Sequence, residues 1–289
     1  MTIITSQDEA LSHERLAQLT PTDIRAMNYN DLIALVRETN RIPGGRRTVH
    51  LIASRLMLTR ESKVLEIGCA TGSTTIELAR LTGCKISAID LNPTSIAEAK
   101  RRATLLGVDI DVKVADALAV PEPDASFDAL ICGNVTALIN DKAKAVREYD
   151  RLLKEGGMLI AVPMYYVTQP SNDLVNKVRR AIQVDIPIHD REQALELYLN
   201  LGFEVYDILD FAFDDIPLER VKNVSRDILA REHLSGLMPQ TRETLEDVYM
   251  EYMELFRNNL ALMGYSVMLL RKTAFVEDPE LFTARPVGG

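Results

Sequence analysis

Short apolar runs alternate with amphipathic stretches through the middle of the chain. The run at 64–67 is bounded by polar residues and is followed at once by a helical pattern at 74–81. The same alternation recurs downstream. Further strands are expected at 86–90, 110–114, 129–134, 158–162, 203–213 and 264–270, and further helices at 93–106, 141–153, 171–184 and 190–201. This order of strands and helices predicts an α/β fold.

Helical patterns without strands flank this alternation on both sides. Before it, residues 21–39 predict a helix that Thr22 or Asp23 could cap, a turn follows at 42–45, and a short helix is expected at 48–57. Later, 216–259 reads as a helical insertion broken at Pro239. We therefore divide the chain into four parts. These are a helical cap (1–60), a central core (61–165), a second half of the sheet that carries the insertion (166–275) and a tail (276–289).

The segment 64–73 has the order strand, tight turn and helix start that is typical of a ligand-binding loop. Backbone N–H groups at such a helix start are expected to point at the ligand. The spacing is Glu66-x-Gly68-x-Ala70-x-Gly72. A dinucleotide fingerprint, G-x-G-x-x-G, would need glycine at Ala70 and Ser73, so the spacing argues against a nicotinamide cofactor.

Two further acids follow expected strands. Asp90 ends the strand at 86–90, and Asp116 comes just after the strand at 110–114. An acid in such a place can be a turn former or helix cap, or its carboxylate can accept hydrogen bonds from a ligand. Because both acids follow the same topological signal as the glycine turn, a shared ligand explains them together.

These motifs resemble those of the class I S-adenosylmethionine-dependent methyltransferases. The first motif of that family is (D/E)-x-G-x-G-x-G, here with Ala70 at the middle glycine, which requires a φ at Ala70 that a Cβ tolerates. The Leu-Lys-x-Gly-Gly turn at 153–157 is a further hallmark of the family. The resemblance is dense over about 60–165 and loose over 190–272. It implies a doubly wound, mostly parallel seven-stranded sheet with its last strand antiparallel beside the sixth, an N-terminal helical cap and a helical insertion before the last strand.

The resemblance also implies a cofactor and a binding site for it. The cofactor is S-adenosyl-L-methionine, with S-adenosyl-L-homocysteine as product, and no metal is expected. Asp90 would accept hydrogen bonds from the ribose hydroxyls, and Asp116 would lie against the adenine amino group. Arg46 or Arg47 could meet the methionyl carboxylate or an anionic group of the substrate. The expected cofactor-binding residues are Glu66, Gly68, Cys69, Ala70, Gly72, Asp90, Leu91, Asp116, Ala117, Asn134, Tyr29 and Arg46.

Methyl transfer from a sulfonium depends mainly on holding the acceptor in line and excluding water, so a catalytic side chain is optional. Many small-molecule relatives place a histidine after the fourth strand, but residues 134–138 contain none. Topology places Asn134, Tyr165 and Tyr166 nearest the acceptor, and we expect these three residues to line its site and orient it. Tyr29 is either a polar group of the site or a buried aromatic residue.

The composition indicates which kinds of molecule the protein is expected to bind. The 289 residues are 47% apolar, enough for a full core, and the net charge of −9 disfavours a nucleic-acid partner. Charge is uneven, because 37–60 holds six arginines and one acid, which could be only a solvated helix face. The three cysteines are widely spaced, and neither an apolar leader nor a membrane span is evident, which predicts a cytoplasmic protein.

The predicted function is methyl transfer to a small-molecule acceptor, by resemblance close to the ubiquinone/menaquinone and natural-product branch of the family. O-, N- and C-methylation all remain open. The alternatives are a non-catalytic S-adenosylmethionine-binding partner subunit, a protein-substrate methyltransferase and a nicotinamide oxidoreductase. An apolar stripe at 245–256 could be core packing, a pocket wall or the face of a homodimer.

Overall fold

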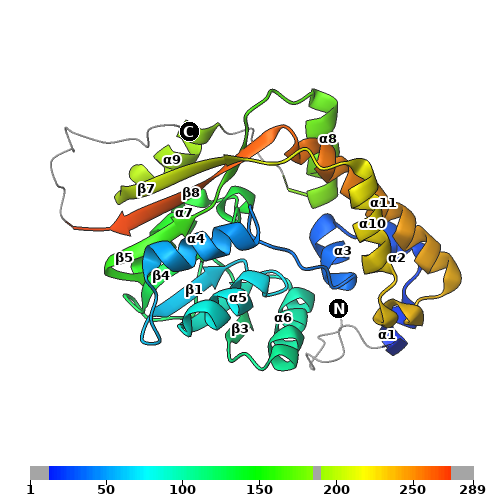
Figure 1. Ribbon diagram of the computed structural model, residues 1–289, viewed down its shortest axis with the longest axis horizontal. Coiled ribbons are helices and arrows are strands. Elements are labelled where there is room, and N and C mark those ends of the chain that lie inside the picture. The colour runs from blue at the N-terminus through cyan, green and yellow to red at the C-terminus, as the bar shows by residue number, and fades with distance from the viewer. Residues whose placement is uncertain (1–12, 185–189, 275–289) are drawn as a thin grey trace.

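A computed structural model describes residues 13–184 and 190–274, which form a twisted sheet flanked by helices with a further layer of helices at its side (Figure 1). The expected tail (276–289) and the first residues of the expected cap lie outside the described residues. The strands are β1 (Lys63–Ile67), β2 (Lys85–Asp90), β3 (Asp111–Val114), β4 (Phe127–Cys132), β5 (Leu153–Ala161), β6 (Met164–Tyr166), β7 (Phe203–Ala212) and β8 (Met263–Lys272). The α/β fold predicted from the sequence is confirmed.

The sheet runs in the order β3-β2-β1-β4-β5-β8-β6, and β7 also pairs with β8. Neighbouring strands from β3 to β5 are parallel, and β8 is antiparallel to its partners β5, β6 and β7. The mostly parallel, doubly wound sheet and its antiparallel last strand are therefore as expected. Because parallel strands all end at one edge, the turns after β1, β2, β3 and β4 meet there.

The sheet has eight strands where seven were expected, because β6 forms in the segment that follows β5. Met164, Tyr165 and Tyr166 pair with Tyr265, Gly264 and Met263 of β8, on the edge of β8 that also pairs with β5. The sequence pattern gave no sign of this strand, since three residues are too few to show a period. Its formation fixes which tyrosine faces which side of the sheet.

Helices cover both faces of the sheet. One face carries α4 (Arg46–Leu56), α5 (Ser73–Thr82) and α6 (Pro93–Leu106), and the other carries α7 (Lys142–Leu152) and α9 (Arg191–Leu199). The fully buried Leu65 and Ile67 of β1 pack toward α7, while the buried Val64 packs toward α4 and α5. Alternate residues of a central strand thus enter two cores, which explains the continuous apolar run.

The N-terminal helices and the insertion form a common helical layer beside the sheet (Figure 1). Its members are α1 (His13–Gln18), α2 (Pro21–Ala26), α3 (Tyr29–Leu35), α10 (Leu218–Leu229), the 3-10 turn η3 (Glu232–Gly236) and α11 (Pro239–Leu260). Ile24 and Leu32 pack with Leu245 and Tyr249 in one core. The apolar stripe of the insertion is therefore core packing at its first half. The remaining helix, α8 (Asn172–Ile182), lies above this layer in Figure 1.

The single helix expected over 21–39 is wrong, because the chain breaks at Met27 and Asn28. Asn28 is an extended N-cap whose side chain accepts a hydrogen bond from the Asp31 backbone N–H, and it begins α3 as a separate helix. The first of the two helices is capped by Thr20, not by Thr22 or Asp23, and Asp23 completes the capping box. Apolar periodicity runs through both helices, whereas the polar cap between them decides the break.

Candidate functional site

A cavity of about 920 Å³ opens at the edge where β1, β2, β3 and β4 end. The carboxyl ends of these strands and the turns after them form one wall, which brings together most of the residues predicted from the glycine turn and the two acids. Of the predicted residues, those that line the cavity are Gly68, Ala70, Asp90, Leu91, Asp116, Ala117, Asn134, Tyr29 and Tyr166.

The turn after β1 needs left-handed backbone at three positions. Gly68 has φ of 71° and Gly72 has φ of 77°. A Cβ at Gly68 would lie 2.2 Å from Cγ2 of Val135, so glycine lets the turn approach the segment after β4. Ala70, expected at a φ that a Cβ tolerates, also lies in the left-handed region at 45°, which corrects that expectation. The turn therefore carries backbone strain at the position where the family has glycine.

The backbone N–H groups of this turn bond within the protein rather than projecting free toward a ligand. Gly68 and Cys69 donate to the Ile89 carbonyl, and Ala70 donates to Oδ2 of Asp90 at 2.9 Å. The expectation that these amides point at the ligand is wrong for these three residues. Their hydrogen bonds instead lock the turn to the end of β2 and orient the Asp90 carboxylate.

Glu66 does not line the cavity. Its side chain is buried beneath the turn and accepts a hydrogen bond from the Thr75 hydroxyl at the start of α5. Burial raises the pKa of the Glu66 carboxyl to about 7 despite this hydrogen bond. The residue therefore ties β1 to α5 and holds the glycine turn between them.

Asp90 and Asp116 present carboxylates to the same cavity. Oδ1 of Asp90 accepts from the Asn92 N–H at 2.8 Å, and Oδ1 of Asp116 accepts from the Leu118 N–H at 2.9 Å. Each carboxylate is thus held by backbone donors and keeps lone pairs for a ligand hydroxyl or amine. Burial raises the pKa of Asp90, and its backbone hydrogen bonds to Asn92 and Ala70 oppose that rise.

Besides Glu66, three predicted cofactor residues lie outside the cavity lining. Cys69 is buried behind the turn, and Gly72 forms the N-cap of α5 against Ala99, where a Cβ would lie 2.7 Å from the Ala99 Cβ. Arg46 is exposed at the start of α4, and its Nε lies 3.5 Å from Oε1 of Glu77. The structure places Arg46 outside the cavity, whereas Arg41 of the preceding loop lines it.

The side of the cavity beyond β4 is formed by β6 and α11. Asn134 has a left-handed φ of 62°, and its Oδ1 accepts from the Met164 N–H at 3.0 Å. Tyr166 lines the cavity and donates from its hydroxyl to Oδ1 of Asn259 at 2.6 Å. The prediction that Tyr165 lines the acceptor site is wrong. Adjacent residues of a strand face opposite sides, and the Tyr165 hydroxyl lies 2.8 Å from Oγ of Ser266, away from the cavity.

Much of the cavity wall opposite the cofactor motifs is formed by residues that no sequence motif marks. The loop 40–44 closes one side, and apolar residues of α8 and α11 close another. The Tyr29 ring lies 4.2 Å from the Phe256 ring, centroid to centroid, which joins α3 and α11 at the cavity. The apolar residues that line this side include Val175, Val178, Ile182, Phe213, Phe256, Leu260 and Met263. The 3.6-residue period of these helices shows an apolar face, but it does not tell a cavity wall from a core.

Two sequence comparisons bear on this site. The profile of the methyltransferase domain family matches residues 64–157, the part of the chain that supplies the glycine turn, Asp90 and Asp116. This segment of the chain is therefore similar to a methyltransferase domain. It is 29% identical over 181 residues to a sterol 24-C-methyltransferase of Eremothecium gossypii, covering 60% of this chain and 48% of that protein. It is 28% identical over 182 residues to an uncharacterized protein of Haemophilus influenzae, covering 62% of this chain and 72% of that protein.

Solved structures share the fold of this chain. The MccD protein superposes with a TM-score of 0.67 at 20% identity and covers 81% of this chain and 100% of that chain. The [4+2]-cyclase SpnF superposes with a TM-score of 0.63 at 21% identity and covers 89% of this chain and 98% of that chain. At about 20% identity, these superpositions show a shared fold and do not show a shared activity.

Two further features of the described residues concern metal binding and the crossing of a membrane. Within 13–184 and 190–274, no three His, Cys, Asp or Glu side chains group as ligands for a metal ion. In the same ranges, no helix is both long and apolar enough to cross a membrane.

Proposed function

We propose that this chain transfers a methyl group from S-adenosylmethionine to a small, largely apolar acceptor. The observation that carries the proposal is one cavity with two unlike ends. The Asp90 and Asp116 carboxylates and the glycine turn lie on one wall, and the apolar residues of α8 and α11 lie on another. A nucleoside with a charged amino-acid tail and an apolar acceptor would each find a chemically matched wall.

The residues present fit the cofactor. Asp90 would accept hydrogen bonds from the ribose hydroxyls, and Asp116 would lie near the adenine amino group. The lack of a Cβ at Gly68 keeps the turn clear of Val135 and preserves the shape of this end. When bound, S-adenosylmethionine supplies an electrophilic methyl on a sulfonium, and the chain has only to orient the acceptor and exclude water.

The acceptor end suggests how the chain orients a substrate. Tyr166 and Asn259 form a hydrogen-bonded pair among apolar side chains, so a single polar group of the acceptor would bind there while its apolar body packs on Val178 and Phe256. No histidine lines the cavity within the described residues.

The relatives are consistent with a range of small acceptors. Proteins of similar sequence are named as sterol C-methyltransferases, an O-methyltransferase and phosphoethanolamine N-methyltransferases. Among these, the apolar wall favours the hydrophobic acceptors over phosphoethanolamine. A protein substrate is not favoured, because the apolar wall lies inside a cavity rather than along an open groove.

The proposal is tested by measuring S-adenosylhomocysteine release with matched acceptor panels. One panel contains isoprenoid alkenes, quinols and hydrophobic phenols, and the other contains small hydrophilic amines such as phosphoethanolamine. We expect turnover with a member of the first panel and little with the second. Phe256→Ala should raise the KM for that acceptor while S-adenosylhomocysteine affinity changes less than a few-fold. Binding of S-adenosylhomocysteine without transfer to any acceptor would favour a non-catalytic binding role, and turnover only with hydrophilic amines would overturn the assignment of the apolar wall.

A further inference from the structure

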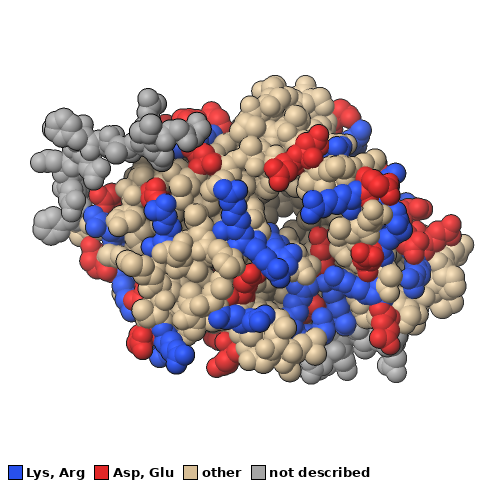
Figure 2. Space-filling view, in the orientation of Figure 1, with Lys and Arg blue, Asp and Glu red and all other residues tan. Residues whose placement is uncertain are grey.

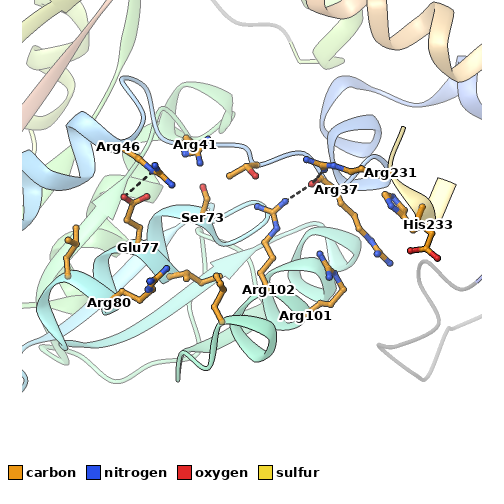
Figure 3. A pocket seen from close by; sticks show the side chains of 15 residues that line it. Arg37, Arg41, Arg46, Ser73, Glu77, Arg80, Arg101, Arg102, Arg231 and His233 are labelled. Carbon is orange, nitrogen blue, oxygen red and sulfur yellow. Dashed lines mark hydrogen bonds and ion pairs between the residues drawn. The ribbon is translucent and has the colours of Figure 1, made fainter. Parts of the chain in front are cut away.

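A second hollow, which the function above does not use, lies on the outer side of the loop 37–46. Its volume is about 990 Å³, and it is lined by that loop, by α5 and α6 and by the segment 231–233. Figure 2 shows lysine and arginine side chains gathered around a hollow near the middle of this face, and Figure 3 shows the arginines that surround it. We call this hollow the arginine cleft.

The charge of the arginine cleft opposes that of the whole chain. Seven arginines line it, against the two carboxylates of Glu77 and Glu232, whereas the chain has a net charge of −9. The buried Glu98 lies beneath the cleft, with its carboxylate 2.7 Å from Nε of both Arg101 and Arg102. Three carboxylates therefore do not balance the cations, and the cleft keeps a strong positive field.

Two of the arginines have a structural task. Arg102 donates to the carbonyls of Arg37 and Glu38 at 2.6 and 2.9 Å, and Arg231 donates to the carbonyl of Val36 at 2.8 Å. These carbonyls follow α3, where helix carbonyls lack intrahelical partners. Arg102 and Arg231 thus fix the loop, and their presence needs no ligand to explain it.

Arg101 and Arg46 pair with Glu98 and Glu77, and the three remaining arginines are not explained by such partners. Within the described residues, the guanidinium groups of Arg41 and Arg80 make no hydrogen bond or ion pair, although both side chains line the cleft. Nε of Arg37 lacks a hydrogen-bond partner, and its nearest acidic oxygen is Oε2 of Glu98 at 3.5 Å. The buried Nε of Arg37 is a donor without an acceptor, which is costly unless a ligand supplies one. Arg41 and Arg80 are exposed, so their guanidinium groups are available to an anion in the hollow.

The surroundings disfavour the charged form of two members of the set. Burial lowers the pKa of Arg37, and Arg101, Arg231 and Arg102 lower it further, against the opposing effect of Glu98. Burial and the neighbouring Arg102 also lower the pKa of Arg231. A bound anion would relieve this repulsion and replace lost hydration.

We propose that the arginine cleft binds a small molecule that carries a phosphate or diphosphate group. Planar guanidinium forks match phosphate oxygens in pairs, and Arg37, Arg41, Arg80 and Arg101 line the hollow from two sides (Figure 3). The cleft is concave and bounded by the cap at one end, which suits a compact anion. A nucleic acid would need a long basic surface, and the chain is acidic.

The cleft shares a wall with the methyltransferase cavity. Arg41 lines both, while Asn40 and Ile42 line the cavity and Thr39 lines the cleft. The hydroxyls of Thr71 and Ser73 hold the loop through the carbonyls of Glu38 and Asn40. An anion in the cleft would therefore contact the outer side of a loop whose inner side closes the cavity.

The test is calorimetric titration of the full chain with pyrophosphate and with ATP at low salt, beside vesicles of phosphatidylglycerol. We expect saturable binding of pyrophosphate or ATP that weakens as salt is raised. The double variant R80Q/R101Q should weaken it about tenfold or more, since charged hydrogen bonds are lost. The matched control is R147Q, which removes one exposed arginine from α7 on the other face of the sheet and should leave the affinity unchanged.

The titration distinguishes this site from the methyltransferase cavity. S-adenosylhomocysteine affinity of R80Q/R101Q, measured in the same series, shows whether the fold is intact, and it depends on Asp90 rather than on the cleft. No saturable binding of either phosphate compound, equal binding by wild type and R80Q/R101Q, or binding to vesicles alone would each overturn the proposal.

Discussion

The hydroxyl of Tyr249 donates a 2.5 Å hydrogen bond to Oε2 of Glu38 and thereby joins the insertion helix to the loop that separates the cavity from the arginine cleft. The carbonyl of Glu38 also accepts from the Thr71 hydroxyl at 2.9 Å, so the loop is held from the core as well. Burial raises the pKa of Glu38, and the Tyr249 hydrogen bond counters that rise. Glu38 thus links the helical layer, through its carboxylate, to the core, through its backbone carbonyl.

Tyr249→Phe should lower the free energy of unfolding by about 1–3 kcal/mol, because the largely buried carboxylate of Glu38 loses a donor. It should also weaken S-adenosylhomocysteine binding, since the loop walls the cavity. Tyr252→Phe is the matched control, because its hydroxyl donates only to the Met27 carbonyl at 3.1 Å, and it should cost less. Urea unfolding and calorimetry check both effects. Equal destabilisation by the two variants would contradict the claim that the Tyr249–Glu38 hydrogen bond stabilises the fold more than the Tyr252–Met27 hydrogen bond does.

The neighbouring tyrosines of β6 should behave differently. Tyr166→Phe removes the hydroxyl that bonds to Asn259 in the cavity and should lower turnover while S-adenosylhomocysteine affinity changes less than a few-fold. Tyr165→Phe removes a hydrogen bond to Ser266 outside the cavity and should change stability more than turnover. Steady-state kinetics with one acceptor measure the turnover of both variants, and thermal unfolding measures their stability. A larger loss of turnover in Tyr165→Phe would mean that the two side chains have been assigned to the wrong faces of β6.

Ala70→Gly should restore the family motif and remove left-handed strain. Left-handed backbone costs a non-glycine residue about 1–2 kcal/mol, and glycine costs about 0.5–1 kcal/mol in unfolded-chain entropy, so stability should stay equal or rise by about 1 kcal/mol. Ala119→Gly, at an exposed alanine outside the left-handed region, should instead destabilise. Chemical denaturation compares them. A destabilised Ala70→Gly variant would show that the Ala70 methyl makes packing contacts that outweigh its strain.

Glu66 gives stability a pH dependence whose sign follows from its raised pKa. The reference value is 4.5 and the folded value is about 7, so the folded state holds a proton that the unfolded state releases. Its contribution is fully present below about pH 4.5 and is lost as pH rises through about 7, by at most about 3 kcal/mol. Glu66→Gln removes this titration. The wild type should therefore lose stability relative to Glu66→Gln between pH 4.5 and 7.

Urea unfolding at several pH values tests this dependence. The control Glu61→Gln changes an exposed carboxyl whose pKa is lowered by the Thr59 hydroxyl, and it should not reproduce the slope. A constant difference between wild type and Glu66→Gln across this range would show that Glu66 is ionised in the folded protein.

The strands, the glycine turn and the acids at the strand ends could be predicted from the sequence, because each depends on a local pattern. Asp90 and Asp116 meet in one cavity simply because parallel strands end at one edge. The acceptor side could not be predicted in the same way. Whether Tyr165 or Tyr166 faces the cavity depends on β6, which exists only through its pairing with β8. Asn259 reaches the cavity from a helix 93 residues away from Tyr166, and no local signal marks that contact.

The displacement of Arg46 from its predicted role has a similar cause. The sequence shows the excess of arginine in 37–60, but only the fold determines which side of the loop each arginine faces. Arg41 lines both the cavity and the arginine cleft, whereas Arg46 lies with Glu77 at the cleft alone.

Calorimetric titration of wild type and Asp90→Asn with S-adenosylhomocysteine and with NADH tests directly whether Asp90 and the glycine turn bind S-adenosylmethionine. We predict one saturable site for S-adenosylhomocysteine in the wild type and none for NADH. Asp90→Asn should weaken the site by about 10–100-fold, because the amide keeps one acceptor oxygen and loses one charged hydrogen bond, which is worth about 1.5–3 kcal/mol. Asp111→Asn, on β3 outside the cavity lining, should leave it unchanged. The absence of S-adenosylhomocysteine binding to the wild type, or equal affinity in Asp90→Asn, would contradict the account.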